Sequence, residues 1–148
     1  RAELLLRMGD VEEAIRQYRV AVKRWPDSAI SLNALGYSLA DLTDRFDEAE
    51  RLIRRALNLQ PESAAIIDSW GWILYRRGKN EEALEYLQKA YQKLRDPEIA
   101  GHIIEVLWVM GRQGDAITTI DEAQILFPES KILDRLRERI NAESTSQD

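Results

Sequence analysis

The chain has 148 residues, of which 45% are hydrophobic and 32% charged, with a net charge of −5 and no cysteine. This composition is typical of an ordinary folded domain, too polar for a membrane span and too apolar for disorder. The acidic balance disfavours binding to a nucleic-acid backbone, which needs a basic surface, and the lack of cysteine excludes disulfides and sulfur-ligated metals.

Small residues recur along the chain with a period near 34. Two series of alanines, seven residues apart, repeat at separations of 35, 34 and 33. This spacing is typical of helix pairs stacked into a solenoid, where backbones approach closely at the same place in every unit. The sequence therefore predicts an all-α solenoid. The two series are Ala14, Ala49, Ala83 and Ala116, and Ala21, Ala56, Ala90 and Ala123.

The first unit, residues 1–28, is incomplete. We expect residues 4–8 to end a truncated first helix, Gly9 and Asp10 to turn the chain, and residues 11–24 to form the second helix. The chain has no initiator methionine and starts inside a unit. We therefore expect a fragment, and any targeting signal or lipid anchor would lie upstream of it.

Three complete units are predicted at residues 29–63, 64–96 and 97–130. The serines that follow a proline-containing turn are expected to cap the first helices of two units and the last helix. Asp96, which precedes Pro97, is expected to cap the first helix of the last unit. The predicted helices cover residues 29–42, 46–59, 64–77, 81–94, 97–110 and 115–126.

Residues 131–141 are predicted to form a capping helix. One apolar stripe consists of Ile132, Leu133, Leu136 and Ile140, and the opposite face is charged. A solenoid ends in a helix with a polar outer side. The expected domain therefore covers residues 1–142, followed by a flexible, solvated tail at 143–148.

The repeated pattern resembles the tetratricopeptide repeat. In the third unit its large and small positions are occupied by Trp70, Gly71, Ala83, Leu87 and Ala90. The resemblance covers nearly the whole chain and implies a right-handed superhelix of antiparallel hairpins that binds proteins. The fourth unit departs from the pattern, because Ile104 stands where a small residue is usual. This implies a wider helix separation there.

Four strings look like the C-terminal repeats of a group of bacterial outer-membrane lipoproteins: NALGY at 33–37, DSWGW at 68–72, DPEIA at 96–100 and EVLW at 105–108. One member type of that group is a scaffold for a carboxyl-terminal processing protease in the periplasm. The likeness implies a periplasmic adaptor, anchored to the outer membrane through an upstream segment, with such a protease as partner. A cytoplasmic location is the alternative.

The first helix of each unit lines the concave surface in such stacks. The predicted protein-binding groove consists of Asn33, Tyr37, Asp68, Trp72, Tyr75, Arg76, Glu105 and Trp108, which share this face by helical spacing. Aromatic and arginine side chains dominate binding hot spots, so we expect Trp72 and Trp108 to be exposed anchors. Alternatively, both fill space between hairpins. Gly101, in the middle of a helix, predicts a gap near Trp108.

No catalytic, cofactor or metal site is predicted. His102 is the single histidine, without a second histidine or a cysteine to share a metal, and we expect it to be structural. No glycine-rich phosphate loop or nucleophile elbow occurs. The groove also lacks the lysines with which some members of the family hold the C-terminal carboxylate of chaperones.

The sequence thus predicts a non-catalytic adaptor or scaffold that holds a protein partner in its groove. It predicts neither nucleic-acid binding nor membrane insertion by this fragment. The alternative is a structural module that self-associates or assembles complexes without a peptide ligand. RNA binding by a helical repeat is a third possibility, which the acidic charge disfavours.

Overall fold

The computed structural model describes residues 2–146, and over this range the chain forms eight helices and no strand. The all-α solenoid is therefore confirmed. The helices are α1 (Ala2–Arg24), α2 (Ala29–Leu42), α3 (Phe46–Leu59), α4 (Ala64–Arg76), α5 (Asn80–Lys93), α6 (Pro97–Val109), α7 (Gln113–Leu126) and α8 (Lys131–Ser146).

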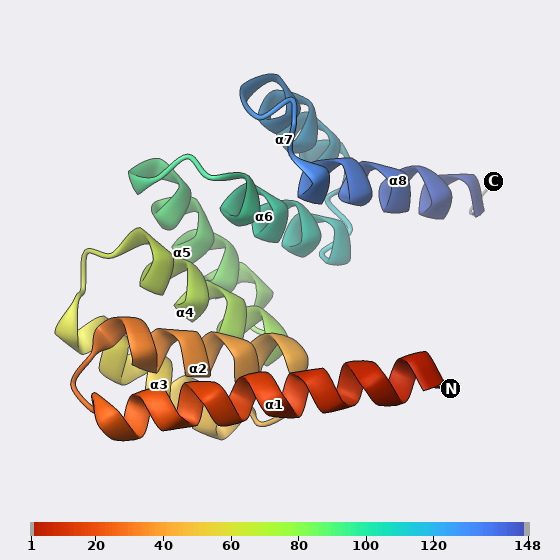
Figure 1. Ribbon diagram of the computed structural model, residues 1–148. Helices are drawn as coiled ribbons and strands as arrows, with labels where there is room; N and C mark the ends of the chain where they lie inside the picture. The colour runs from red at the N-terminus through yellow and green to blue at the C-terminus, as the bar shows by residue number, and fades with distance from the viewer. Residues whose placement is uncertain (1, 147–148) are drawn as a thin grey trace.

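Each even-numbered helix packs on the odd-numbered helices next to it in the chain, and the even-numbered helices also pack on one another. Figure 1 shows α2, α4, α6 and α8 as one continuous row, with α3 and α5 behind α2 and α4. We call the surface of this row the inner face. It is built from the first helices of the predicted units, with α8 continuing the row.

Local signals explain where the helices begin and end. Ser28 and Ser63 each accept a hydrogen bond from the backbone N–H three residues on, at 3.2 and 3.4 Å. Asp96 caps α6 in the same way, with Pro97 as the first helical residue. Gly78 and Gly111 follow α4 and α6 with φ of +84° and +81°, a conformation that favours glycine.

Close packing within each hairpin depends on small residues. A Cβ atom on Gly36 would lie 2.7 Å from Cγ1 of Ile53, and one on Gly71 would lie 2.8 Å from Cγ of Leu87. Ile104 occupies the corresponding place in α6. In line with the wider separation predicted there, α6 and α7 pack less closely than the helices of the other two hairpins do.

The apolar core is divided into two clusters. The first is built on α1 to α4 and the second on α4 to α8, and only partly buried side chains such as Leu57 and Tyr75 touch both. No Cα atom of α2 lies within 8 Å of one in α6. Direct ties between these two helices must therefore be made by long side chains.

The predicted turn at Gly9 and Asp10 is wrong, because α1 runs through both residues. Gly9 lacks the positive φ of Gly78 and Gly111. A truncated helix of a few residues buries too little surface to offset the hydrogen bonds that a turn would break. The side chains of residues 1–7 lie outside the described part of the structure.

The predicted end of α8 is also wrong, since the helix continues to Ser146. The segment after Asn141 contains no helix breaker, and the Trp108 indole donates a hydrogen bond to Glu143. Residues 143–146 are therefore helical, and residues 147–148 lie outside the described range. The apolar stripe of α8 packs on α6 and α7, with Leu133 and Ile140 buried.

Between residues 2 and 146, no helix combines the length and apolar character needed to cross a bilayer. In the same part of the chain, no group of three or more histidine or acidic side chains is arranged to hold a metal ion.

Candidate protein-binding groove

Three adjoining cavities line the inner face. The first, of about 320 Å³, lies between α2, α4 and the start of α6, and the second, of about 270 Å³, lies between α2, α4, α6 and α8. The third, of about 160 Å³, lies between α4, α6 and α8. Tyr37 and Glu98 line both the first and the second, and Glu105, Leu136 and Arg139 line both the second and the third. The three cavities therefore form one groove.

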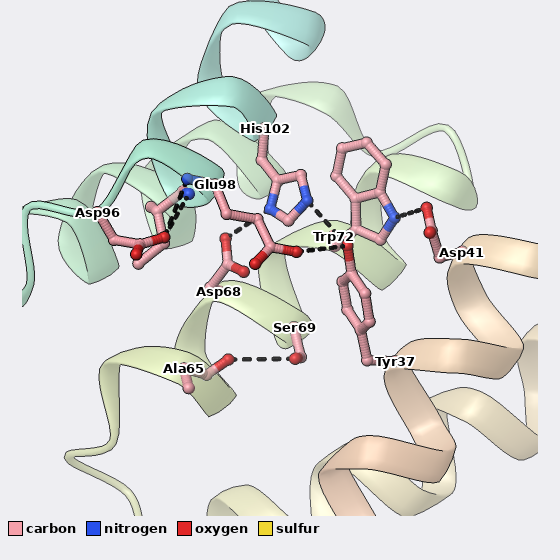
Figure 2. A network of polar contacts seen from close by, with 10 residues as sticks. Tyr37, Asp41, Ala65, Asp68, Ser69, Trp72, Asp96, Glu98 and His102 are labelled. Carbon is pink, nitrogen blue, oxygen red and sulfur yellow. Dashed lines mark hydrogen bonds and ion pairs between the residues drawn. The ribbon is translucent and has the colours of Figure 1, made fainter. Parts of the chain in front are cut away.

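A polar cluster lies where the first two cavities meet, and Figure 2 shows its side chains. Nδ1 of His102 lies 2.8 Å from Oδ1 of Asp68, and Nε2 lies 3.0 Å from the hydroxyl oxygen of Tyr37. The same hydroxyl lies 3.5 Å from Oε1 of Glu98, a long hydrogen bond. The imidazole thus connects α2, α4 and α6, and His102 and Asp68 are 8% and 7% exposed.

The indole of Trp72 forms the other wall of this cluster. It stacks on the imidazole of His102 with ring centroids 4.2 Å apart, and the ring of Tyr75 lies tilted against it with centroids 4.8 Å apart. Its Nε1 donates a hydrogen bond of 3.1 Å to Asp41. Since the indole N–H is satisfied and both ring neighbours are protein side chains, Trp72 is a packed element of the groove floor.

Burial and charge act in opposite directions on His102. Burial alone would lower its pKa, but the hydrogen bond to Asp68 and the carboxylates of Asp68, Glu98 and Asp41 outweigh burial and raise it. Burial, followed by the same three carboxylates, raises the pKa of Tyr37. The cluster therefore favours a cationic His102 beside a neutral Tyr37.

The third cavity joins α8 to the row. Nη1 of Arg139 donates to Oε1 of Glu105 at 2.9 Å, and the Trp108 indole donates to Glu143. Tyr75 and Trp108 are both half-buried on its wall. The side chains of the capping helix therefore form part of the groove as well as the end of the core.

Most of the predicted site residues come together along this groove. Asn33, Tyr37 and Asp68 line the first cavity, Trp72 the second, and Tyr75 and Trp108 the third, while Glu105 lies between the last two. Oδ1 of Asn33 is buried without a hydrogen-bond partner.

Two expectations about these residues are wrong. Trp72 is only 5% exposed and is no exposed anchor, because His102 from the next unit covers it. Arg76 is apart from the groove. Its Nε donates to the backbone oxygen of Ala40 at 2.9 Å and its guanidinium lies over the ring of Phe46, beside a separate cavity at the hairpin turns.

Sequence reasoning treated His102 as structural and left it, and the arginines of α8, out of the groove. A usable signal was present, because side chains one repeat apart face each other across neighbouring first helices. His102 follows Asp68 by 34 positions, and Arg139 follows Glu105 by 34. A search for complementary groups at this separation would have found both pairs.

Comparison with known proteins gives a consistent result. The tetratricopeptide repeat family model matches residues 1–64, 43–98 and 69–131. A TPR repeat-containing protein of Pseudomonas aeruginosa is 45% identical over 105 residues, which cover 71% of this chain and 18% of that protein. Another, from Methanocaldococcus jannaschii, is 28% identical over 116 residues, which cover 78% of this chain and 20% of that protein. The chain spans about a fifth of the length of these curated relatives.

Solved structures share the fold. A thermophilic TPR protein of Thermus thermophilus superposes with a TM-score of 0.76 at 22% identity, over 95% of this chain and 76% of that chain. A tetratricopeptide repeat protein of Parabacteroides merdae gives 0.77 at 21% identity, over 98% of this chain and 57% of that chain.

Proposed function

Because this chain belongs to the tetratricopeptide repeat family, whose repeats are protein-interaction modules, we propose that it acts as a non-catalytic adaptor that binds a protein partner along the groove. The observation that carries the proposal is the continuity of the three cavities over α2, α4, α6 and α8. Together they offer an extended path rather than one enclosed pocket, and an extended path suits a segment of polypeptide.

The groove also offers both kinds of contact that protein interfaces use. Tyr75 and Trp108 supply half-buried aromatic surface, while Glu98 and Arg139 supply charged groups at the rim. Aromatic centres within a polar rim are typical of interfaces. Of the two tryptophans expected to act as anchors, we propose only Trp108, because it is half-buried whereas Trp72 is buried.

The proposed partner is a carboxyl-terminal processing protease, and the proposed location is the periplasm, with attachment to the outer membrane. The support for both is the likeness of the strings at 33–37, 68–72, 96–100 and 105–108 to repeats of lipoprotein adaptors. Purified protease of this class, added to the immobilised chain, should be retained. Failure of the chain and of its full-length form to retain it would refute this partner.

Site-specific cross-linking tests the groove itself. A photoreactive residue at Arg135, which is exposed and lines the second cavity, should capture the partner from the full-length protein in its native extract. The matched control is Gln88, which is exposed on α5. Capture at Gln88 with none at Arg135 would contradict binding in the groove. Capture of a second copy of the chain at Gln88 would instead favour the structural assembly module.

A further inference from the structure

The cluster around His102 ties together parts of the solenoid that otherwise do not meet. The backbones of α2 and α6 stay more than 8 Å apart at every Cα pair. Yet Tyr37 of α2 reaches both His102 and Glu98 of α6. In Figure 2 the hydroxyl of Tyr37 contacts both the imidazole and the carboxylate of Glu98, while Asp68 of α4 approaches the imidazole from the other side.

This tie crosses the boundary between the two apolar clusters. Tyr37 packs against the first cluster, whereas α6 belongs to the second. The row helices α4 and α6 also pack less closely than α2 and α4 do. On the inner face, the hydrogen bonds of one imidazole therefore supply a direct tie between the two halves.

We propose that His102 is a proton-operated clamp, which sets the width and the charge of the groove. The proposal deepens the proposed function, because the groove it regulates is the one assigned to the protein partner. With the imidazole protonated, Nδ1–H donates to Asp68 and Nε2–H donates to the oxygen of Tyr37, so the hydroxyl proton of Tyr37 is directed to Glu98. All three side chains are then held by matched donors and acceptors.

Loss of one proton to solvent rearranges this chain of hydrogen bonds. The Nδ1–H stays with Asp68, and Nε2 becomes an acceptor. The hydroxyl of Tyr37 must turn its own proton to Nε2, so the carboxylate of Glu98 loses its donor. The charge-assisted bond between α2 and α6 becomes a neutral one, which is roughly half as strong.

The charged groups around the imidazole determine the effect on the groove. Asp41 and the neutral Tyr37 face it from α2, Asp68 from α4, and Glu98 and Glu105 from α6, while Arg135 and Arg139 of α8 line the same cavity. Arg139 is paired with Glu105. Without the imidazolium charge, the repulsion between the carboxylates of Asp41, Asp68 and Glu98 is less well offset. This repulsion loosens the packing of α6 to α8 against α2 and α4.

The direction of the pH effect follows from the raised pKa of His102. The clamp is fully engaged below the ordinary histidine pKa of about 6.5. It is lost as the pH rises through the higher pKa of the folded state. The groove should therefore be narrower and less negative at mildly acidic pH than at alkaline pH.

Two measurements on the chain without any partner test the clamp. His102 is the single histidine, so its NMR titration from about pH 5 to about pH 9 reports this imidazole alone. Spin labels on cysteines at Ile30 of α2 and Glu138 of α8, both exposed in a chain without native cysteine, report the width of the groove. We expect the label distance to increase with the same pH midpoint as the NMR titration.

Variants separate the clamp from general pH effects. In His102→Gln the distance should stay constant over this pH range. In Tyr37→Phe, which keeps the pair of His102 and Asp68, the distance at low pH should shift toward the high-pH value. Circular dichroism confirms that each variant folds.

An imidazole that titrates in the wild type without any change in label distance would overturn the proposal. An equal pH response in His102→Gln would overturn it as well, and so would an imidazole that stays neutral down to about pH 5. None of these results bears on the cross-link at Arg135, which tests the binding groove separately.

Discussion

Gly71 and Gly101 both lie in the middle of a first helix, and the structure predicts opposite outcomes when each is changed to alanine. Replacing a mid-helix glycine with alanine gains about 1 kcal/mol of helix propensity. At Gly71 a Cβ atom would lie 2.8 and 2.9 Å from two side-chain carbons of Leu87 and 3.1 Å from the backbone oxygen of Ala83. A backbone oxygen in the partner helix cannot move without shifting that helix.

Overpacking of this kind costs about 1–3 kcal/mol. After the gain in propensity, Gly71→Ala should lower the free energy of unfolding by up to about 2 kcal/mol. At Gly101 the nearest atoms are Cδ1 of Leu136 at 3.2 Å and Cγ2 of Ile132 at 3.4 Å, both at the ends of side chains on α8. Because these ends can give way, Gly101→Ala should be neutral or stabilising by up to about 1 kcal/mol.

Thermal unfolding followed by circular dichroism distinguishes the two variants. For a chain of this size, 1 kcal/mol corresponds to a change of about 2–4 °C in Tm. Gly71→Ala should melt below the wild type and Gly101→Ala at or above it. If Gly71→Ala melts at or above Gly101→Ala, the close approach of α4 and α5 does not limit the size of this residue, and the packing argument fails.

Three further predictions concern the core, the cap and the groove. Ala83 is fully buried, so Ala83→Leu should lower stability by about 1–3 kcal/mol in denaturant unfolding, and an unchanged midpoint would contradict its assigned place between helices. Leu136→Asp puts a carboxylate into the contact of α8 with the core, so hydrogen exchange in α6 should accelerate; protection equal to that of the wild type would show that α8 does not cap the stack. Trp108→Ala should weaken binding of the partner more than about tenfold, a loss of 1.4 kcal/mol or more, while Arg51→Ala on α3 should leave the affinity unchanged; the reverse order would place the interface on the outer helices.

The sequence was sufficient for the fold because the periodic residues are the ones that fix helix packing. Gly36 and Gly71 recur where the paired helices nearly touch, and Ser28 and Ser63 recur where first helices begin. Such signals are local or repeat at one constant separation. The path of α1 through Gly9 could not be read in this way, since a glycine permits a turn and does not require one.

Less of the groove could be predicted, because helical spacing gives the face of a helix and leaves the depth of a side chain undetermined. Trp72 is on the predicted face, but the imidazole of His102 from the next unit covers it. How far one unit overlaps the next depends on the twist of the whole stack. Arg76 shows the same limit. It directly follows Tyr75, which lines the groove, but its side chain points out of the groove and lies over the ring of Phe46.

The membership of α4 in both apolar clusters has a consequence for how the molecule unfolds. Ile66 and Ile73 belong to the first cluster and Ile67 to the second. Repeat arrays are described as chains of units coupled to their nearest neighbours, and such chains can lose units from the ends. In this chain, neither half can unfold without exposing one apolar side of α4 to solvent. Fraying from either terminus should therefore stop at α4, and this helix should show the slowest amide exchange in the chain.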